Sequence, residues 1–204
     1  MAEKKQTFFT IPNIISLARI AMIPVFAWGF LAGREILALV VVILSGISDR
    51  LDGSIARKYN MVSEAGKMLD PLADKLTQVV LALILFLRFL GSDDRLMRFT
   101  AWVFMGFIAK EIFMLLFALA MILMKKRPAA AEIWGKAATV AFYIVMGILL
   151  LAGPDIGIIA KYFDGLSLPP VVVLVLVVLN LLLMIAAFLS YIPDTYRKVV
   201  KGEE

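Results

Sequence analysis

The chain has 204 residues, of which 62% are hydrophobic, and its mean hydropathy is +0.94. Soluble domains are about 45–50% apolar, so this composition excludes an ordinary soluble enzyme and predicts an integral membrane protein. The formal net charge of +5 fits Lys and Arg residues that collect at the cytoplasmic ends of membrane helices and meet anionic headgroups there. We therefore expect membrane lipids, and no nucleic acid, as partners of the basic residues.

Two missing residue types narrow the chemistry further. The sequence contains no Cys and no His, which excludes disulfides, zinc sites built from thiolate or imidazole, and cysteine nucleophiles. A metal ion would have to be a hard cation held by oxygen atoms. A general base would have to be a carboxylate, a lysine or a tyrosine.

Apolar stretches that approach the length needed to cross a bilayer, about 20 residues, occur six times. We predict an all-α bundle of six transmembrane helices that forms one catalytic domain over residues 1–204. The expected spans are 14–33, 35–57, 66–90, 98–124, 135–153 and 168–191. Between the last two spans, residues 156–162 can form a short interfacial helix.

Basic residues are distributed unevenly between the two ends of the expected bundle. Clusters at 4–5, 57–58, 125–127 and 197–201 all fall on the side that carries both termini. The positive-inside rule assigns that side to the cytoplasm. We therefore expect a multi-pass protein of the inner (cytoplasmic) membrane, with both termini and the acidic site described next facing the cytoplasm.

The junction of the second and third spans holds four aspartates. Asp49 and Asp52 are spaced i, i+3 on one helix, and Asp70 and Asp74 are spaced i, i+4 on the next, so each pair shares one helix face. A short turn makes the two helices antiparallel, and we expect the acidic faces to meet at the cytoplasmic end. Carboxylates this close repel one another unless some are protonated or a cation binds. The pattern predicts one or two divalent ions, and Mg²⁺, Mn²⁺ and Ca²⁺ all suit oxygen ligands.

Two neighbours of these aspartates suit a bulky phosphorylated ligand. Gly53 removes a side chain where such a ligand can approach the backbone. Arg57 offers a planar fork for phosphate or carboxylate.

Written by spacing, the window reads Asp49-x2-Asp52-Gly53-x2-Ala56-Arg57-x8-Gly66-x3-Asp70-x3-Asp74. This pattern resembles the signature of the CDP-alcohol phosphotransferases, integral membrane enzymes of phospholipid synthesis, and every fixed position is filled. Residues 10–19 are similar to the opening segment of that family. Within the family, residues 69–75 most resemble phosphatidylglycerophosphate synthases and the related cardiolipin synthases.

The resemblance implies roles for the four aspartates. They would bind two Mg²⁺ or Mn²⁺ ions that clamp the pyrophosphate of CDP-diacylglycerol, the donor. Asp74 would also take the proton from the acceptor hydroxyl, which attacks the phosphorus attached to diacylglycerol while CMP leaves. The residues implied in donor binding are Asn13, Asp49, Asp52, Gly53, Arg57, Ser63 and Gly66.

The resemblance also implies an acceptor. For a CDP-diacylglycerol–glycerol-3-phosphate 3-phosphatidyltransferase, the acceptor phosphate needs a basic pocket, and Lys110 and Lys136 are the candidates. Phosphatidylglycerophosphate synthases tend to have Arg-Glu and Gly-Lys-x-Lys-Thr at these places. This chain has Lys110-Glu111 and Gly135-Lys136-Ala137-Ala138-Thr139, so the second lysine is missing.

Alternatives to this acceptor site remain. A structural ion pair with Glu111 is the alternative for Lys110. Phosphatidylglycerol, the acceptor of a cardiolipin synthase of the same fold, is the runner-up to glycerol 3-phosphate, with inositol phosphate or serine behind it.

A divalent-cation carrier is the alternative from another class, because acids in a membrane serve ion transport too. A carrier should place its acids near the middle of the bilayer, in interrupted helices. Here the acids lie at one surface beside Gly53 and Arg57, which favours the enzyme. Asn180, in the last span, can hydrogen-bond between helices or across a dimer, and we expect a homodimer.

Overall fold

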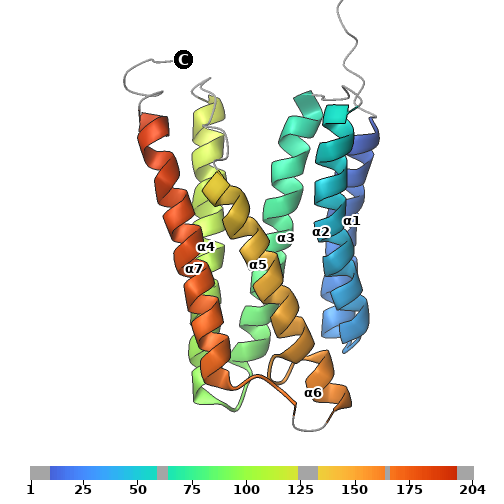
Figure 1. Cartoon of the computed structure of the whole chain (residues 1–204), viewed down its shortest axis with the longest axis vertical. Helices are drawn as coiled ribbons and strands as arrows, with labels where there is room; N and C mark the ends of the chain where they lie inside the picture. The colour runs from blue at the N-terminus through green and yellow to red at the C-terminus, as the bar shows by residue number, and fades with distance from the viewer. Residues whose placement is uncertain (1–9, 59–63, 124–132, 164–165, 197–204) are drawn as a thin grey trace, which may run out of the picture. The chain divides into compact units, whose positions relative to one another are not determined.

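The structure is a computed structural model that describes residues 10–58, 64–123, 133–163 and 166–196; within these, the side chains at 12, 49–58, 64–71, 118–123, 133–134, 160 and 191–196 are not described. Over the described ranges the chain is helical and contains no strand, which confirms the all-α prediction. The helices are α1 (Ile11–Leu31), α2 (Glu35–Lys58), α3 (Glu64–Leu90), α4 (Arg95–Leu123), α5 (Ile133–Ala152), α6 (Ile158–Tyr162) and α7 (Pro170–Tyr196) (Figure 1).

Among the described residues, four helical segments are long and apolar enough to cross a membrane. They are Asn13–Leu31, Arg95–Phe117, Gly135–Ala152 and Pro170–Ser190. The described part of α2 contributes a shorter apolar stretch, Glu35–Ser48, and that of α3 carries Asp74, Lys75 and Arg88. The protein thus has the helices of a membrane protein, whereas the count of six spans stays a prediction because α2 and α3 have charged ends.

The chain folds into two compact units, residues 1–84 and 85–204. In the first unit, α1 packs against α2 (Figure 1). The turn between them uses Gly33 at φ 70°, a left-handed conformation that glycine adopts at no steric cost. The guanidinium of Arg34 lies 5.1 Å from the centre of the Trp28 ring, in a cation–π contact. These contacts close the end of the α1–α2 pair that lies away from the acidic stretch of α2.

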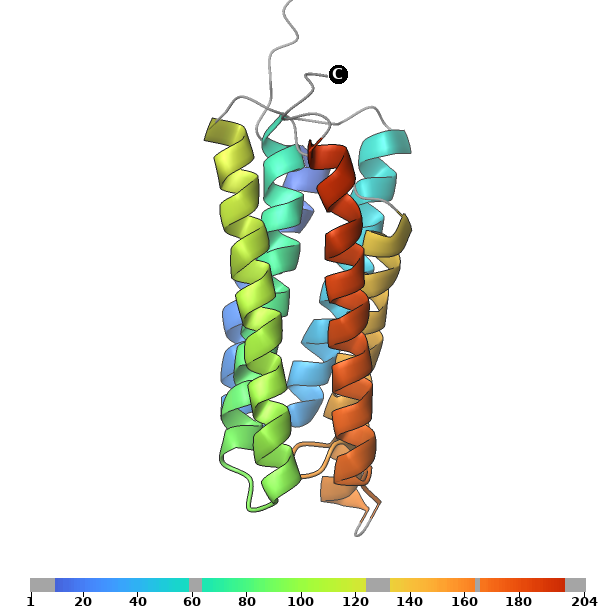
Figure 2. The same ribbon diagram turned by 90° about the vertical axis from the view of Figure 1, so that its left-hand side faces the viewer.

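In the second unit, α7 packs against both α4 and α5, and the short α6 packs against α5 (Figure 2). Aromatic rings follow one another through this unit: the ring centres of Phe104 and Phe107 are 5.8 Å apart, and those of Phe107 and Phe142 are 5.6 Å apart. Phe113 of α4 meets Phe188 of α7 edge-to-face at 5.5 Å. Such ring pairs add to the stabilisation that burial provides.

Charged residues around the α3–α4 loop stabilise helix ends and loops. The Oδ1 atom of Asp94 accepts from the backbone N–H groups of Leu96 and Met97, at 2.7 and 3.0 Å, which is an N-cap for α4. The hydroxyl of Ser92 donates to Oδ2 of Asp155, at 2.8 Å. This bond joins the loop before α4 to the turn after α5. The segment after that turn forms α6, so the predicted short helix is present.

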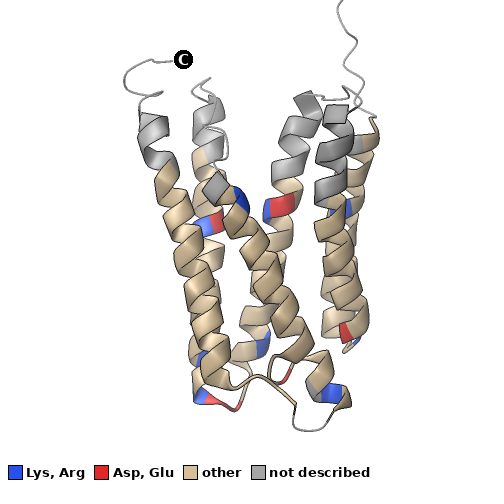
Figure 3. Ribbon diagram, in the orientation of Figure 1, with Lys and Arg blue, Asp and Glu red and all other residues tan. Residues whose placement is uncertain are grey.

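Asn180 lies on α7, which carries no charged residue along the part that Figure 3 colours. Its side chain is only 4% exposed, and neither its amide nitrogen nor its amide oxygen has a hydrogen-bond partner among the described residues. Burial inside one chain favours the interior of the bundle over a contact across a dimer.

Replacing Gly157 with alanine is expected to destabilise the turn after α5. The new Cβ would lie 2.7 Å from the carbonyl oxygen and 2.8 Å from the nitrogen of Gly153, and backbone atoms cannot move aside cheaply. Overpacking of this kind costs about 1–3 kcal/mol. The matched control is Gly147→Ala in α5, where nothing lies within 4 Å of the new Cβ. Thermal unfolding in detergent should give a lower Tm for Gly157→Ala alone; equal Tm values would contradict the packing argument.

Candidate metal and nucleotide site

The first half of the acidic pattern lies on one continuous helix. α2 extends to Lys58, so Asp49, Asp52, Gly53 and Arg57 all belong to its carboxyl-terminal part. A helix over these residues is what the i, i+3 spacing requires for Asp49 and Asp52 to share a face. Their side chains lie outside the described residues, so the contacts of Asp49, Asp52 and Arg57 stay predictions.

The second half lies on the next helix. α3 begins at Glu64, so Gly66, Asp70 and Asp74 follow one another along its first turns. Ser63 lies outside the described residues, as do the side chains around Gly66 and Asp70. Of the four predicted metal ligands, Asp74 is the one whose side chain is described.

The carboxylate of Asp74 has a specific partner. The Nε2 atom of Gln78 donates to its Oδ2 atom at 3.0 Å. Gln78 is one helical turn further along α3 and is only 3% exposed, whereas Asp74 is half-buried. Gln78 was not among the predicted site residues, although an amide four residues after an acid in an apolar helix is a recognisable signal for such a pair.

The opening segment of α1 presents a buried polar face to the interior. Asn13, Ser16 and Arg19 recur every three residues and are 1%, 0% and 1% exposed. Thr10 caps this helix, since its hydroxyl oxygen accepts from the backbone N–H of Asn13 at 3.4 Å. The predicted nucleotide contact Asn13 thus lies inside the protein, and Ser16 and Arg19 lie on the same buried face. Sequence reasoning missed this face, although the three-residue spacing of polar side chains in an apolar helix marks it.

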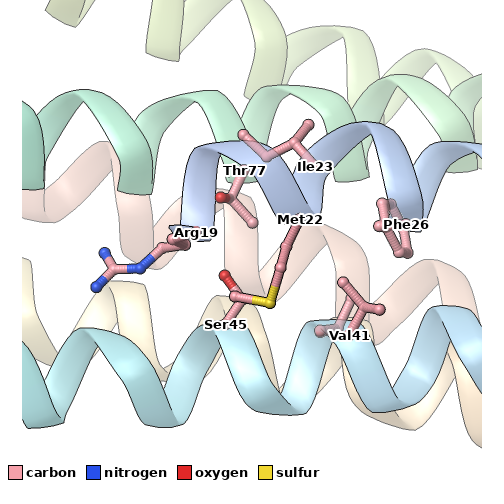
Figure 4. A pocket seen from close by; sticks show the side chains of 8 residues that line it. Arg19, Met22, Ile23, Phe26, Val41, Ser45 and Thr77 are labelled. Carbon is pink, nitrogen blue, oxygen red and sulfur yellow. The ribbon is translucent and has the colours of Figure 1, made fainter. Parts of the chain in front are cut away.

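A small pocket lies in the first unit between α1, α2 and α3 (Figure 4). Arg19 and Met22 of α1, Ser45 of α2 and Thr77 of α3 line it, with apolar neighbours. Figure 4 shows the guanidinium of Arg19 pointing away from the apolar part of the pocket, back along α1 toward the start of that helix. The pocket is mostly apolar and too small for a nucleotide. Ser45 of α2 and Thr77 of α3 both line this pocket, so these two positions lie near one another.

The two candidate acceptor residues lie in the second unit. Lys110 of α4 forms an ion pair with its neighbour Glu111, and their side chains are 14% and 3% exposed. This is the structural pairing that the sequence left open as the alternative for Lys110. Lys136, near the start of α5, is exposed.

The available donors fit a hard divalent cation. The chain offers no imidazole or thiolate, and the described candidate ligand is a carboxylate already oriented by an amide donor. Within the described side chains no three His, Cys, Asp or Glu residues form a cluster, and the side chains of Asp49, Asp52 and Asp70 lie outside that set. Carboxylate oxygens are the ligands that Mg²⁺ and Mn²⁺ prefer.

Among the known proteins to which this chain is similar, some align over most of its length. The CDP-diacylglycerol–glycerol-3-phosphate 3-phosphatidyltransferase of Bacillus subtilis is 34% identical over 176 residues, 78% of this chain and 86% of that protein. The protein of the same name from Aquifex aeolicus is 27% identical over 191 residues, 94% of this chain and 98% of that protein.

Other relatives match over a shorter stretch. A cardiolipin synthase (CMP-forming) of Streptomyces coelicolor is 48% identical over 73 residues, which span 33% of this chain and 34% of that protein. The chain thus matches about a third of the length of that relative.

A family model described as CDP-alcohol phosphatidyltransferase matches residues 9–192. The matched region contains the described helices α1 to α7, up to the last turn of α7. Divalent metal ions are typical of this family. Because the match covers nearly the whole sequence and includes the complete aspartate signature, the chain belongs to the CDP-alcohol phosphatidyltransferase family of transferases.

Proposed function

We propose that this protein is a CDP-diacylglycerol–glycerol-3-phosphate 3-phosphatidyltransferase, a phosphatidylglycerophosphate synthase of phospholipid biosynthesis. It would transfer the phosphatidyl group of CDP-diacylglycerol to glycerol 3-phosphate and release CMP. The relatives from Bacillus subtilis and Aquifex aeolicus, which align over most of the chain, carry this name. The hydrogen bond from the buried Gln78 to the half-buried Asp74 supports a site near the start of α3.

The observation that carries the proposal is the pocket shared by Ser45 and Thr77. Asp49 follows Ser45 by four residues on α2, and Asp74 precedes Thr77 by three residues on α3. The two helices run in opposite directions (Figure 1), so both aspartates are displaced from the pocket toward the same end. At 1.5 Å per residue the displacements are about 6 and about 4.5 Å. This supports an approach of the acidic faces of α2 and α3 to one another, as a shared metal site requires.

In the proposed site, the four aspartates Asp49, Asp52, Asp70 and Asp74 would hold two Mg²⁺ or Mn²⁺ ions. Two such ions supply charge stabilisation to both the attacking and the leaving oxygen of an in-line displacement. Asp74 accepts the proton of the acceptor hydroxyl as that oxygen bonds to the phosphorus attached to diacylglycerol, and the bond from this phosphorus to CMP breaks. Gly53 lets the cytidine approach α2, and Arg57 binds a phosphate of the nucleotide. Asn13, Ser63 and Gly66 complete the donor site.

The acceptor phosphate is assigned to Lys136. Lys110 is already paired with the buried Glu111, and a partner held this way favours a structural role. Lys136 is exposed near the start of α5, and the positive-inside rule assigns that end to the cytoplasmic surface, where a soluble phosphate compound would reach it.

Replacing Lys136 with alanine is expected to raise the KM for glycerol 3-phosphate by about tenfold, the effect of losing one charge-assisted contact worth roughly 1.5 kcal/mol. The KM for CDP-diacylglycerol should change by less than a factor of two, because the residues proposed to bind the donor do not include Lys136. Steady-state kinetics in mixed micelles measures both values. Lys161→Ala on α6 is the control, since Lys161 is also an exposed lysine. Equal effects of Lys136→Ala on both substrates would argue against an acceptor-phosphate contact.

The experiment that tests the proposed function is an acceptor panel. Purified protein, CDP-diacylglycerol and Mg²⁺ are incubated with glycerol 3-phosphate, phosphatidylglycerol, inositol phosphate or serine, and the lipids are separated by thin-layer chromatography. Phosphatidylglycerophosphate together with CMP is the expected product. Formation of cardiolipin from phosphatidylglycerol would show that the protein is a cardiolipin synthase instead. Metal flux into vesicles without CMP release would favour the carrier.

The remaining architecture is proposed with the function. Six transmembrane helices form one catalytic domain in the inner membrane, with both termini and the site on the cytoplasmic side, and two protomers form a homodimer. Because Asn180 is buried within one chain, the proposed dimer contact would involve other residues.

A further inference from the structure

Gln78 is a buried amide whose donor nitrogen is directed at the proposed catalytic carboxylate. The bond from its Nε2 atom to Oδ2 of Asp74 is 3.0 Å long, which is within the ordinary range for an N–H···O bond. We propose that Gln78 is a positioning residue that holds the carboxylate of Asp74 in one orientation for metal binding and proton acceptance. This inference rests on the proposed function only for the role of Asp74.

The direction of the contact follows from helix geometry. Side chains in an α-helix lean toward the amino end of the helix, so a residue at i+4 covers the residue at i. Gln78 therefore approaches Asp74 from the carboxyl-terminal, more apolar part of α3. In the opposite direction, toward the amino end of α3, Asp70 precedes Asp74 by one turn. Gln78 thus orients Asp74 without occupying the side where the other ligands are expected.

Packing makes this donor rigid. Gln78 is 3% exposed, and its neighbours on the same helix, Thr77, Leu81 and Ala82, are 6%, 0% and 1% exposed. A glutamine side chain loses rotamer entropy when it is immobilised, and here folding has already imposed that loss. The terminal torsion of an aspartate is soft and broad, so a fixed donor on one oxygen restricts it.

A purely structural role explains Gln78 less well. A buried polar group in an apolar helix costs free energy unless it is hydrogen-bonded, and an apolar side chain of similar volume would pack there without that cost. The neighbouring Thr77 satisfies its hydroxyl locally, by donating to the carbonyl of Ala73 at 2.8 Å. Gln78 instead donates to a side chain, the carboxylate of Asp74, which is assigned to the proposed site. Residues that orient metal ligands typically change metal affinity or activity by 10–100-fold when replaced.

The test compares metal binding with stability. Gln78→Met keeps the volume and removes the donor, and Gln78→Asn keeps the amide but shortens its reach. Binding of Mn²⁺ to the purified protein is titrated by electron paramagnetic resonance, with no substrate present. Both variants should bind Mn²⁺ about tenfold or more weakly than the wild type, while the Tm of Gln78→Met in detergent is unchanged or higher. Thr77→Val is the matched control and should bind Mn²⁺ as the wild type does.

Kinetics gives the second readout. With CDP-diacylglycerol and the acceptor that the panel identifies, the two Gln78 variants should need a higher Mg²⁺ concentration for half-maximal rate and should show a lower kcat. Their KM for CDP-diacylglycerol should stay within about threefold of the wild type, because only the orientation of Asp74 changes.

A merely structural Gln78 predicts the reverse pattern, with a lowered Tm and unchanged Mn²⁺ affinity, and that result in either variant overturns the proposal. The Mn²⁺ titration requires no turnover. Failure of the acceptor panel would therefore count against the proposed function alone, whereas wild-type-like Mn²⁺ binding in both variants would count against Gln78 alone.

Discussion

Asp74→Asn is expected to reduce kcat by at least about 10³-fold while the Kd for CDP-diacylglycerol changes by less than threefold. Asparagine has the shape of aspartate and keeps one oxygen as a ligand, but it cannot accept the acceptor's proton. Loss of a general base alone typically costs 10²–10⁴-fold, and the weakened metal site adds to that loss. The donor retains its other contacts in the proposed site, so its binding is largely spared.

Release of radiolabelled CMP measures turnover for this variant, and equilibrium binding of labelled CDP-diacylglycerol in micelles measures affinity. The control is Asp93→Asn, which removes an exposed aspartate in the α3–α4 loop and should keep full activity. Residual activity of Asp74→Asn above about a tenth of the wild type, outside the range for loss of a base, would mean that a different group accepts the proton.

Chelation is the second prediction with a large effect. Treatment with EDTA should lower CMP release to the background, and added Mg²⁺ or Mn²⁺ should restore it. The reason is the composition of the proposed site: four carboxylates at such a site would repel one another strongly without a cation, and the sequence has no imidazole or thiolate to hold a softer metal. Full activity in excess chelator would overturn the metal site altogether.

Thermal unfolding provides the control for the chelation experiment. A ligand that binds only the folded protein stabilises it by RT ln(1 + [L]/Kd), so Mg²⁺ should raise the Tm of the wild type and raise it less for Asp74→Asn. A large Tm loss in EDTA would instead mean that inactivity reflects unfolding.

The helices were largely predictable because local properties determine them. The predicted spans 98–124, 135–153 and 168–191 correspond to α4, α5 and α7, and they differ only in their ends. Apolar length defines such a helix, while caps define its ends: α4 begins at Arg95 because Asp94 caps it. The aspartate signature was equally readable, since its spacing alone places Asp49 and Asp52 on one helix face and Asp70 and Asp74 on another.

The partners of the polar side chains were not predictable. Lys110 was a candidate for the acceptor phosphate or for an ion pair, and only the structure shows the pair with Glu111. The spacing of Gln78 from Asp74 and of Ser16 from Asn13 was visible in the sequence, but their burial was not, because a polar residue in an apolar helix can face lipid, a neighbouring helix or a site. Asn180 could equally face a second protomer until its burial was known.

By itself, the sequence determined that this protein is helical, apolar enough for a membrane, and equipped with oxygen ligands and no softer ones, because composition and helical periodicity act residue by residue along the chain. Tertiary structure decided which polar groups are inside and what they contact. It brought Ser45 and Thr77 to one pocket from different helices, and it buried the Gln78 amide that donates to Asp74. Burial depends on how helices pack across long separations in the chain, and no local pattern carries that information.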